Sequence, residues 1–457
     1  MLERLFKLRE LDTSVGTEVV AGLTTFMTMA YILAVNPIIL SGAGMDYNAV
    51  FLATALAAGI VTIAMGLFVN FPIALAPGMG LNAYFAAVVA SGQMTWQVAL
   101  GAVFISGVIF LILTVTNIRQ LLVEAVPNSM KKAITVGIGL FITFIGVKLS
   151  GLTVVFLELL PGKFGGTLEG IAKAGKGVIQ PTEWVVQLGN ISHGPALLAI
   201  IGLLISGLLM ARKIKGSLLW GIIITTVIGI PLGVTKIEGF KYALPSFSNV
   251  AIGQLDVKGA LGAGLITVIL TFTFVELFDT FGTLVGTAGK AGLLDEKGNN
   301  PKIGRAMLVD ALGVSFGALM GTSTVTAYIE SAAGIGEGGK TGLTAVTTGI
   351  MFLLAIFLAP FFVLIPSAAT APALILVGLL MVSAIRDIDF SEMTEAIPAF
   401  LTIVFMPFTQ NIANGVSAGI FTYVFLKIAT GKAREVHWLM YILVVLVAVR
   451  YTMLGSA

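Results

Sequence analysis

Long apolar segments recur along almost the whole chain, separated by short polar loops, and this pattern constrains the fold more than any other feature. A helix needs about 20 apolar residues to cross the hydrocarbon core of a bilayer, and many segments of that length follow one another here. Of the 457 residues, 57% are hydrophobic and 11% are charged, whereas a soluble domain carries about 25% charged residues. A membrane β-barrel would show alternating segments of about ten residues instead. The sequence therefore predicts an all-α polytopic membrane protein.

The predicted spans form two series of seven. The first series lies near residues 15–36, 48–70, 72–90, 95–116, 128–149, 195–211 and 217–235. The second series lies near residues 259–288, 304–320, 322–337, 342–365, 368–386, 394–410 and 412–430. A last apolar run at 437–455 has no counterpart in the first series, and residues 1–14 are expected to form a short amphipathic segment on the cytoplasmic surface.

The charged and reactive side chains exclude several classes of function. A cytoplasmic N-terminus puts most of the 26 lysines and arginines on the cytoplasmic side, in agreement with the positive-inside rule. The net charge of +3 is spread over the loops and gives no indication of nucleic-acid binding. The chain has no cysteine, and His193 and His437 are isolated, so no thiolate or histidine metal site is expected. No hydrolase motif is present, and we expect neither an enzyme nor a bound cofactor.

The two series show a weak internal repeat. Residues 126–148 align without gaps on residues 365–387, and the alignment matches Pro127 with Pro366 and Gly139 with Gly378. An odd number of spans per series inverts the second copy relative to the first. Inverted repeats are typical of secondary transporters, whose substrate site lies near the bilayer midplane between the halves.

The third and tenth spans are interrupted at corresponding places in the two series. Residues 74–84 contain Pro77 and Gly80, and residues 321–331 contain threonines, among them Thr324, at every second position. Such stretches favour short extended strands, each followed by a half-helix whose N-terminus faces a central ligand. The alternative is a pair of shorter, ordinary helices that pack through their glycines.

Three acidic residues lie inside these apolar segments: Glu276, Asp279 and Glu330. A carboxylate inside a bilayer costs roughly 2.5–3.5 kcal/mol, so such residues are functional candidates by default. Glu276 and Asp279 are three residues apart and share one helical face, which Thr280 extends. The structural alternatives are a buried pair for Glu276, a contact to neighbouring backbone for Asp279 and helix capping for Glu330.

Two other features are interpreted as structural. Asp310 is a further acid within a span, and we expect it to pair with Arg305 or Lys302 near the membrane edge. Residues 334–341 match the phosphate-binding pattern G-x-x-x-x-G-K-[ST], but that motif needs a preceding strand inside a soluble α/β domain. We therefore predict a tight cytoplasmic turn at this motif.

Four stretches of the chain resemble a known family, namely residues 22–37, 76–84, 274–280 and 322–342. The family is that of the AzgA-like adenine/guanine/hypoxanthine permeases, within the nucleobase–cation symporter (nucleobase/ascorbate transporter-like) superfamily. The resemblance covers nearly the whole chain. It implies fourteen spans in a 7+7 inverted repeat, with spans 3 and 10 broken. It also implies a core domain from residues 15–116 and 259–365, and a gate domain from residues 128–235 and 368–430.

The same resemblance implies a function and roles for individual residues. Glu276 and Glu330 would bind the purine, Asp279 and Asn82 would support binding or coupling, and Tyr328 would contact the substrate. The predicted substrate-binding residues are Glu276, Glu330, Asn82, Tyr328, Thr324, Gly80 and Phe274, and those predicted for proton coupling or structural support are Glu276, Asp279 and Thr280. Ser331 follows Glu330 where the uracil/xanthine branch has asparagine, which favours the purine branch.

The resemblance thus implies a proton-coupled symporter that imports a purine nucleobase across the cell membrane by elevator-like movement of the core. Its predicted partners are a purine base, protons, the lipid bilayer and a second copy of the chain bound through the gate domain. The alternative is an anion exchanger or channel on the same fold, because paired helix N-termini suit anions. Three acidic side chains at that site would repel an anion.

Overall fold

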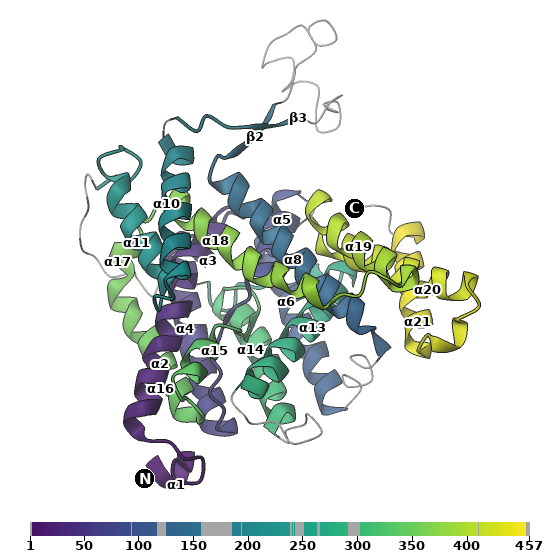
Figure 1. Ribbon diagram of the computed structural model, residues 1–457, viewed down its shortest axis with the longest axis horizontal. Coiled ribbons are helices and arrows are strands. Elements are labelled where there is room, and N and C mark those ends of the chain that lie inside the picture. Colours follow the sequence, from purple (N-terminus) through teal and green to yellow (C-terminus); the bar gives the residue numbers. More distant parts are fainter. Residues whose placement is uncertain are drawn as a thin grey trace, which may run out of the picture.

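The computed structural model describes residues 2–92, 94–116, 125–156, 185–192, 194–237, 240, 242, 251–262, 266–290, 302–409 and 411–453. These residues form a helical bundle from which one strand hairpin projects (Figure 1). The hairpin pairs β2 (Thr153–Phe156) antiparallel with β3 (Val185–Leu188), and both strands belong to the long connection between the fifth and sixth predicted spans.

The first half of the chain is helical apart from β1 and the β2–β3 hairpin. Its other elements are α1 (Leu2–Phe6), α2 (Val15–Met29), α3 (Ile32–Ser41), α4 (Tyr47–Ala64), the π-helix η1 (Met65–Val69), β1 (Leu75–Pro77), α5 (Met79–Ala90), α6 (Trp96–Val115), α8 (Asn128–Leu149), α10 (Gly194–Ala211) and α11 (Ser217–Gly229).

The second half repeats this arrangement of a strand among helices. Its elements are α12 (Val257–Ala260), α13 (Ile266–Lys290), α14 (Lys302–Met320), β4 (Val325–Ala327), α15 (Ser331–Gly336), α16 (Gly342–Leu354), η3 (Ala355–Leu358), α17 (Ala359–Phe362), α18 (Ser367–Val382), η4 (Ser383–Asp387), α19 (Met393–Phe408), α20 (Ile412–Ala429), η5 (Ala433–Glu435) and α21 (Trp438–Met453).

The helices follow the predicted apolar segments closely. Within the described residues, nine helices are long and apolar enough to cross a membrane, and α5, α11 and α19 are shorter apolar helices. The predicted boundaries differ in three places. The first span, predicted as 15–36, consists of the two helices α2 and α3 and extends to Ser41. The eighth span, predicted from residue 259, is represented by α13 from Ile266, and the separate α12 precedes it. The seventh, predicted to end at 235, is represented by α11 and ends at Gly229, since Pro231 cannot continue a helix.

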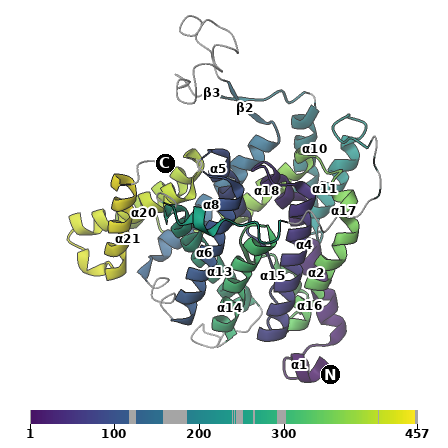
Figure 2. The same ribbon diagram turned by 180° about the vertical axis from the view of Figure 1, so that it is seen from behind.

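The helices pack as two interleaved groups, each drawn from both halves of the chain. In the first group, α2, α4, α5 and α6 pack with α13, α14, α15 and α16. In the second group, α8, α10 and α11 pack with α18 and α19, and α20 packs on α19. Figure 2 shows α20 and α21 at one edge of the molecule and α2 and α16 near the opposite edge. The final apolar run is α21, which packs against α20.

The N-terminal segment docks on the first group. Phe6 and Leu8 are buried and pack with Leu343 of α16. Asn70 connects α1 to the start of α16. Its side-chain amide donates to the Phe6 carbonyl at 3.0 Å, and its side-chain oxygen accepts from the Gly342 amide at 2.7 Å. The segment before α2 is therefore anchored by apolar burial as well as by hydrogen bonds.

Glu18 binds the end of the segment 334–341, which matches the phosphate-binding pattern. This fully buried carboxylate of α2 accepts hydrogen bonds from the backbone amides of Lys340 at 2.9 Å, Thr341 at 3.2 Å and Thr344 at 3.3 Å. The Thr344 and Thr13 hydroxyls donate to the same carboxylate. The Glu18 carboxylate thus accepts the hydrogen bonds of the amides at the end of the motif and at the start of α16. This agrees with the predicted structural turn.

Glu18→Ala is expected to lower stability by about 3 kcal/mol, because hydrogen bonds to a buried charged group contribute about 1.5–3 kcal/mol each and several amides would lose their acceptor. The measurement is the thermal unfolding midpoint of the purified protein in detergent. Glu10→Ala is the control, since Glu10 is exposed and pairs only with Lys7 in the described structure. An unchanged midpoint for Glu18→Ala would refute this role.

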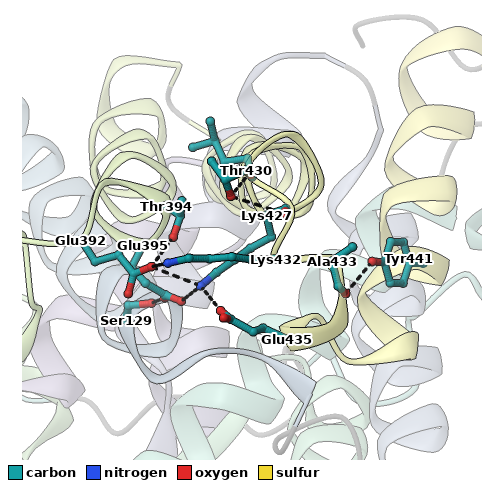
Figure 3. Close-up of polar contacts among 11 residues, drawn as sticks. Ser129, Glu392, Thr394, Glu395, Lys427, Thr430, Lys432, Ala433, Glu435 and Tyr441 are labelled. Atoms are coloured by element: carbon teal, nitrogen blue, oxygen red, sulfur yellow. Dashed lines mark hydrogen bonds and ion pairs between the residues drawn. The ribbon is translucent and has the colours of Figure 1, made fainter.

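A second polar cluster joins α19, α20 and η5 (Figure 3). The Lys427 side chain is only 3% exposed, and its amine lies 3.2 Å from Glu395 and 2.8 Å from Glu435. The Ser129 hydroxyl at the start of α8 donates to Glu395. The cluster therefore links the ends of α8, α19 and α20 to the turn that precedes α21.

Glu392 completes the cluster on its solvent side, where the Lys432 amine and the Thr394 hydroxyl donate to it. The hydrogen bond from Lys432 is the main cause that lowers the pKa of Glu392 from 4.5 to about 2. A carboxyl group with a lowered pKa stabilises the fold above its unfolded pKa and loses that contribution as the pH falls through its folded pKa. Any pH dependence of transport between about pH 5 and 8 must therefore come from other groups.

Candidate substrate site

The centre of the first group is a pair of very short strands. β1 and β4 are antiparallel, with Ala76 opposite Thr326. The pairing continues beyond the strands, because the Tyr328 amide donates to the Ala74 carbonyl at 3.0 Å and the Gly78 amide donates to the Thr324 carbonyl at 2.9 Å. Each strand leads directly into a helix, α5 after β1 and α15 after β4. The starts of both helices are therefore held at this strand pair.

The end of β1 is fixed by side chains from α5 and from the residue that follows β4. The Pro77 carbonyl accepts from the Asn82 side-chain amide at 3.3 Å and from the Tyr328 hydroxyl. The Ser323 hydroxyl donates to the Asn82 side-chain oxygen. Asn82 and Tyr328, both predicted to bind substrate, thus lie together at the strand crossing, where their polar atoms support the backbone. Their contact with a ligand stays a prediction.

The two glycines after Pro77 allow close packing. A Cβ atom on Gly78 would lie 2.8 Å from Thr326 Cγ2, and one on Gly80 would lie 2.5 Å from Ile138 Cγ2 of α8. Larger side chains would therefore push β4 or α8 away. Gly80 was predicted to let a ligand approach, and the structure gives this glycine a packing role against α8.

Glu330 lies at the N-terminal end of α15, immediately before Ser331, and is half-buried. The buried Tyr31 hydroxyl, from the junction of α2 and α3, donates to Glu330 Oε1 at 2.9 Å. The Ser331 hydroxyl accepts from the Ala74 amide at 3.0 Å, which ties the start of α15 to the chain before β1. The helix dipole favours a negative charge at this position. Tyr31 was not predicted, although it lies within residues 22–37, which carry the family resemblance.

Glu276 approaches the strand pair from α13 and is 1% exposed. The Thr280 hydroxyl, one turn further along α13, lies 3.3 Å from Glu276 Oε1 and 2.9 Å from Thr326 Oγ1 of β4. Phe274 and Asp279 belong to the same helix, but their side chains lie outside the described part of the structure, so their predicted roles stay predictions. Glu276 and Thr280 are thus connected to β4.

Asp310 corrects one prediction from the sequence. It is fully buried in α14, where the Ala327 amide donates to Oδ1 at 2.9 Å and the Thr280 hydroxyl lies 2.8 Å from Oδ2. The Lys302 amine donates to the Asn70 carbonyl at 3.1 Å, and Arg305 is exposed. The prediction of an ion pair at the membrane edge is therefore wrong, because the carboxylate of Asp310 faces the strand pair and accepts a hydrogen bond from β4.

One further predicted residue has an unused polar atom. The Thr324 hydroxyl is buried and has no hydrogen-bond partner among the described residues. A Cβ atom on Gly78 would lie 3.5 Å from this hydroxyl oxygen, so the hydroxyl lies beside the start of α5. A buried hydroxyl without a partner is costly, which makes Thr324 a candidate to bond a ligand at the strand crossing.

Comparison with known proteins assigns the chain to a family. The model of the permease family Xan_ur_permease matches residues 16–162 and 164–418. The adenine permease AdeP of Escherichia coli is 44% identical over 95% of this chain and 92% of the relative. The guanine/hypoxanthine permease PbuG of Bacillus subtilis is 40% identical over 96% of this chain and 97% of the relative. The chain belongs to this permease family. It is therefore a multi-pass membrane transport protein and not an enzyme.

Solved structures show the fold of the permease. The transmembrane domain of the cyanobacterial bicarbonate transporter BicA superposes with a TM-score of 0.57 at 17% identity, over 88% of this chain and 97% of that domain. Murine Slc26a9, an anion transporter in the inward-facing state, gives a TM-score of 0.62 at 12% identity, over 91% of this chain and 68% of that chain. The permease shares its fold with these transporters, and at such identities the likeness concerns the fold alone.

Proposed function

We propose that this permease is a proton-coupled symporter that imports a purine nucleobase, such as adenine, guanine or hypoxanthine. The observation that carries the proposal is the convergence of two acidic residues on one strand pair. Glu276 is connected to β4 through Thr280, and Glu330 stands where β4 leads into α15. The relatives AdeP and PbuG are named as purine permeases and align with nearly the whole chain.

The chemistry of the site suits a purine. Purine bases are planar and neutral, and they carry several N–H donors beside ring-nitrogen acceptors. A carboxylate accepts two parallel N–H bonds, as from N1–H and the 2-amino group of guanine, and such charge-assisted hydrogen bonds are strong. We assign base recognition to Glu330, and binding together with protonation to Glu276. Asn82, Tyr328, Thr324, Gly80 and Phe274 complete the proposed binding site.

Packing supports the proposed 7+7 inverted repeat. Pro127 and Pro366, matched by the internal alignment, directly precede α8 and α18. Gly139 and Gly378, also matched, meet where these helices cross, since a Cβ on Gly139 would lie 2.8 Å from the Gly378 carbonyl and one on Gly378 would lie 2.5 Å from the Gly139 carbonyl. Residues related by an internal twofold axis meet in this way when they lie near that axis.

The two packing groups support the proposed division into a core domain and a gate domain. We propose fourteen spans, with the third and tenth broken at β1 and β4, and movement of the core against the gate as an elevator. We also propose that the protein lies in the plasma membrane with its N-terminus in the cytoplasm, in line with the positive-inside rule. A homodimer through the gate domain belongs to the same proposal.

The anion exchanger remains the alternative to be tested, because BicA and Slc26a9 are named as anion transporters. Here Glu276, Glu330 and Asp310 all lie at or next to the strand pair, and their carboxylates oppose an anion at the same place. A neutral base with N–H donors fits these acceptors better.

The test is uptake by purified protein in liposomes with an inward-directed proton gradient. We expect accumulation of radiolabelled adenine, guanine or hypoxanthine, loss of accumulation with a protonophore, and no flux of sulfate or bicarbonate. Glu276→Gln should abolish proton-driven accumulation, whereas Glu10→Gln, the same change on an exposed residue, should leave it intact. Flux of sulfate or bicarbonate without purine uptake would support the anion exchanger, and accumulation that survives Glu276→Gln would contradict the role of Glu276.

A further inference from the structure

Thr280 is placed between two buried carboxylates. Its hydroxyl oxygen lies 2.8 Å from Asp310 Oδ2 and 3.3 Å from Glu276 Oε1. Glu276 is 1% exposed, and Thr280 and Asp310 are fully buried. The three residues come from α13 and α14, which pack against each other. A continuous hydrogen-bonded path therefore runs from the proposed purine-binding acid to a second acid in the neighbouring helix.

A hydroxyl group has a single proton to donate, so Thr280 can serve only one of these carboxylates at a time. Two carboxylates that share a buried site resist double ionisation, and they titrate as a pair. The pair Glu276–Asp310 is therefore suited to hold one proton. Asp310 also accepts from the Ala327 amide at 2.9 Å, and the Thr326 hydroxyl lies 3.4 Å from its Oδ1. Asp310 therefore has two other hydrogen-bond donors beside Thr280.

The elements that pack against α14 contribute few other charges, and α15, which packs against α13, adds Glu330 at its start. The elements that pack most closely against α14 are α4, α6, α13, η1, β1 and β4. Among these, α13 alone has acidic or basic residues, and α14 itself adds two basic ones near its start. The charged residues of these elements besides the pair are Asp279, Lys290, Lys302 and Arg305. Lys290 and Lys302 end α13 and begin α14, so they lie several helical turns from the pair.

We propose that Thr280 relays a proton between Glu276 and Asp310, so that Asp310 is the second proton-holding residue of coupled transport. This inference rests on the proposed function. In the relay, the O–H bond of protonated Glu276 breaks and its proton passes to the Thr280 oxygen. The Thr280 hydroxyl proton passes in turn to the Asp310 carboxylate. Glu276 becomes a carboxylate free to bind the base, Asp310 becomes neutral, and Thr280 ends with one proton as before.

Protonation of Asp310 also affects the part of the site that contains Glu330. Charged Asp310 holds the Ala327 amide at the end of β4, three residues before Glu330. A neutral carboxyl group accepts this hydrogen bond less strongly, because charge-assisted bonds are about twice as strong. Arrival of the proton on Asp310 therefore loosens the end of β4 that positions Tyr328 and Glu330. Asp310 acts here as a positioning residue for the substrate site.

The experiment separates exchange from coupled accumulation in liposomes, with radiolabelled adenine, guanine and hypoxanthine as probes. Exchange of internal for external base needs no net proton movement, whereas accumulation does. Thr280→Val keeps the side-chain shape and removes the relay, so it should retain exchange and reduce proton-driven accumulation about tenfold or more. Thr280→Ser should restore accumulation. Asp310→Asn should lose accumulation while exchange continues at a reduced rate, because Asp310 also holds the Ala327 amide. The pH dependence of exchange should weaken in this variant and persist through Glu276.

The matched control is Thr287→Val, the same substitution two turns further along α13. The Thr287 hydroxyl bonds the Thr283 carbonyl of its own helix at 2.5 Å, so this variant should behave as wild type. Accumulation that survives in Thr280→Val, or exchange that is lost together with accumulation in both Thr280→Val and Asp310→Asn while size exclusion shows folded protein, would overturn the relay. If wild-type protein accumulates none of the three bases, the proposed function itself fails, independently of these variants.

Discussion

Glu330→Ala is expected to weaken purine binding by on the order of 100-fold, because it removes two charge-assisted hydrogen bonds worth about 1.5 kcal/mol each. The carboxylate stands at the start of α15 and is oriented by Tyr31. The protein should remain folded, since Glu330 is half-buried and gives no side-chain cap to its helix. The measurement is competition binding on purified protein with a panel of adenine, guanine, hypoxanthine, uracil and xanthine.

Tyr31→Phe is a milder variant for the same binding experiment. It leaves the carboxylate in place and removes only the hydrogen bond that orients it, so we expect about tenfold weaker binding. The order wild type, Tyr31→Phe, Glu330→Ala should appear for every base that binds. Purine affinity that is unchanged in Glu330→Ala would remove Glu330 from base recognition, and with it the central element of the proposed site.

Lys427→Met should produce the largest loss of stability outside the site. Removing the lysine leaves the partly buried Glu395 with the Ser129 hydroxyl but without its ion-pair partner at the ends of α8, α19 and α20. Breaking a buried pair from one side costs about 3–5 kcal/mol, and we expect the lower end of this range because solvent screens Glu392 and Glu435. The thermal unfolding midpoint in detergent should fall, while the affinity for purine in the folded fraction should stay unchanged.

Two further variants test whether the unpaired charge causes this loss of stability. Glu435→Gln alters a partner that is 54% exposed, so it should change the midpoint little. Glu395→Gln combined with Lys427→Met should recover part of the loss, because the uncompensated charge is then gone. A double variant that is no more stable than Lys427→Met would show that packing of the lysine stem, and not charge, stabilises this cluster.

The membrane class and most helix positions could be predicted because apolar length is a local property of the sequence. The predicted span 128–149 coincides with α8, and the alternating threonines before Glu330 correctly indicated extended chain at β4. Boundaries failed where a polar cap, and not the end of an apolar run, starts an element. α12 and α13 are separate elements, and the side chain of Asp256 at the start of α12 accepts from the Gly259 amide at 2.8 Å. The pattern of apolar residues there does not reveal this cap.

The candidate site was predicted in part. Buried acids are conspicuous in an apolar sequence, so Glu276 and Glu330 could be singled out and their helices named. Tyr31 was missed because a tyrosine in an apolar stretch looks like any other packing residue. Asp310 was assigned to the wrong partner, since Lys302 and Arg305 are its nearest basic residues in sequence, whereas β4 contacts it in space.

The sequence by itself determined that this chain crosses a membrane many times and that it carries acids where acids are costly, and it predicted interruptions in two of its spans. Each of these follows from the composition of a single segment. Only the tertiary structure decided which acids share a donor, which amides Glu18 caps and which glycines meet between α8 and α18. Hydrogen bonds and close contacts act over about 3 Å, and residues far apart in the chain reach that distance only when the helices pack.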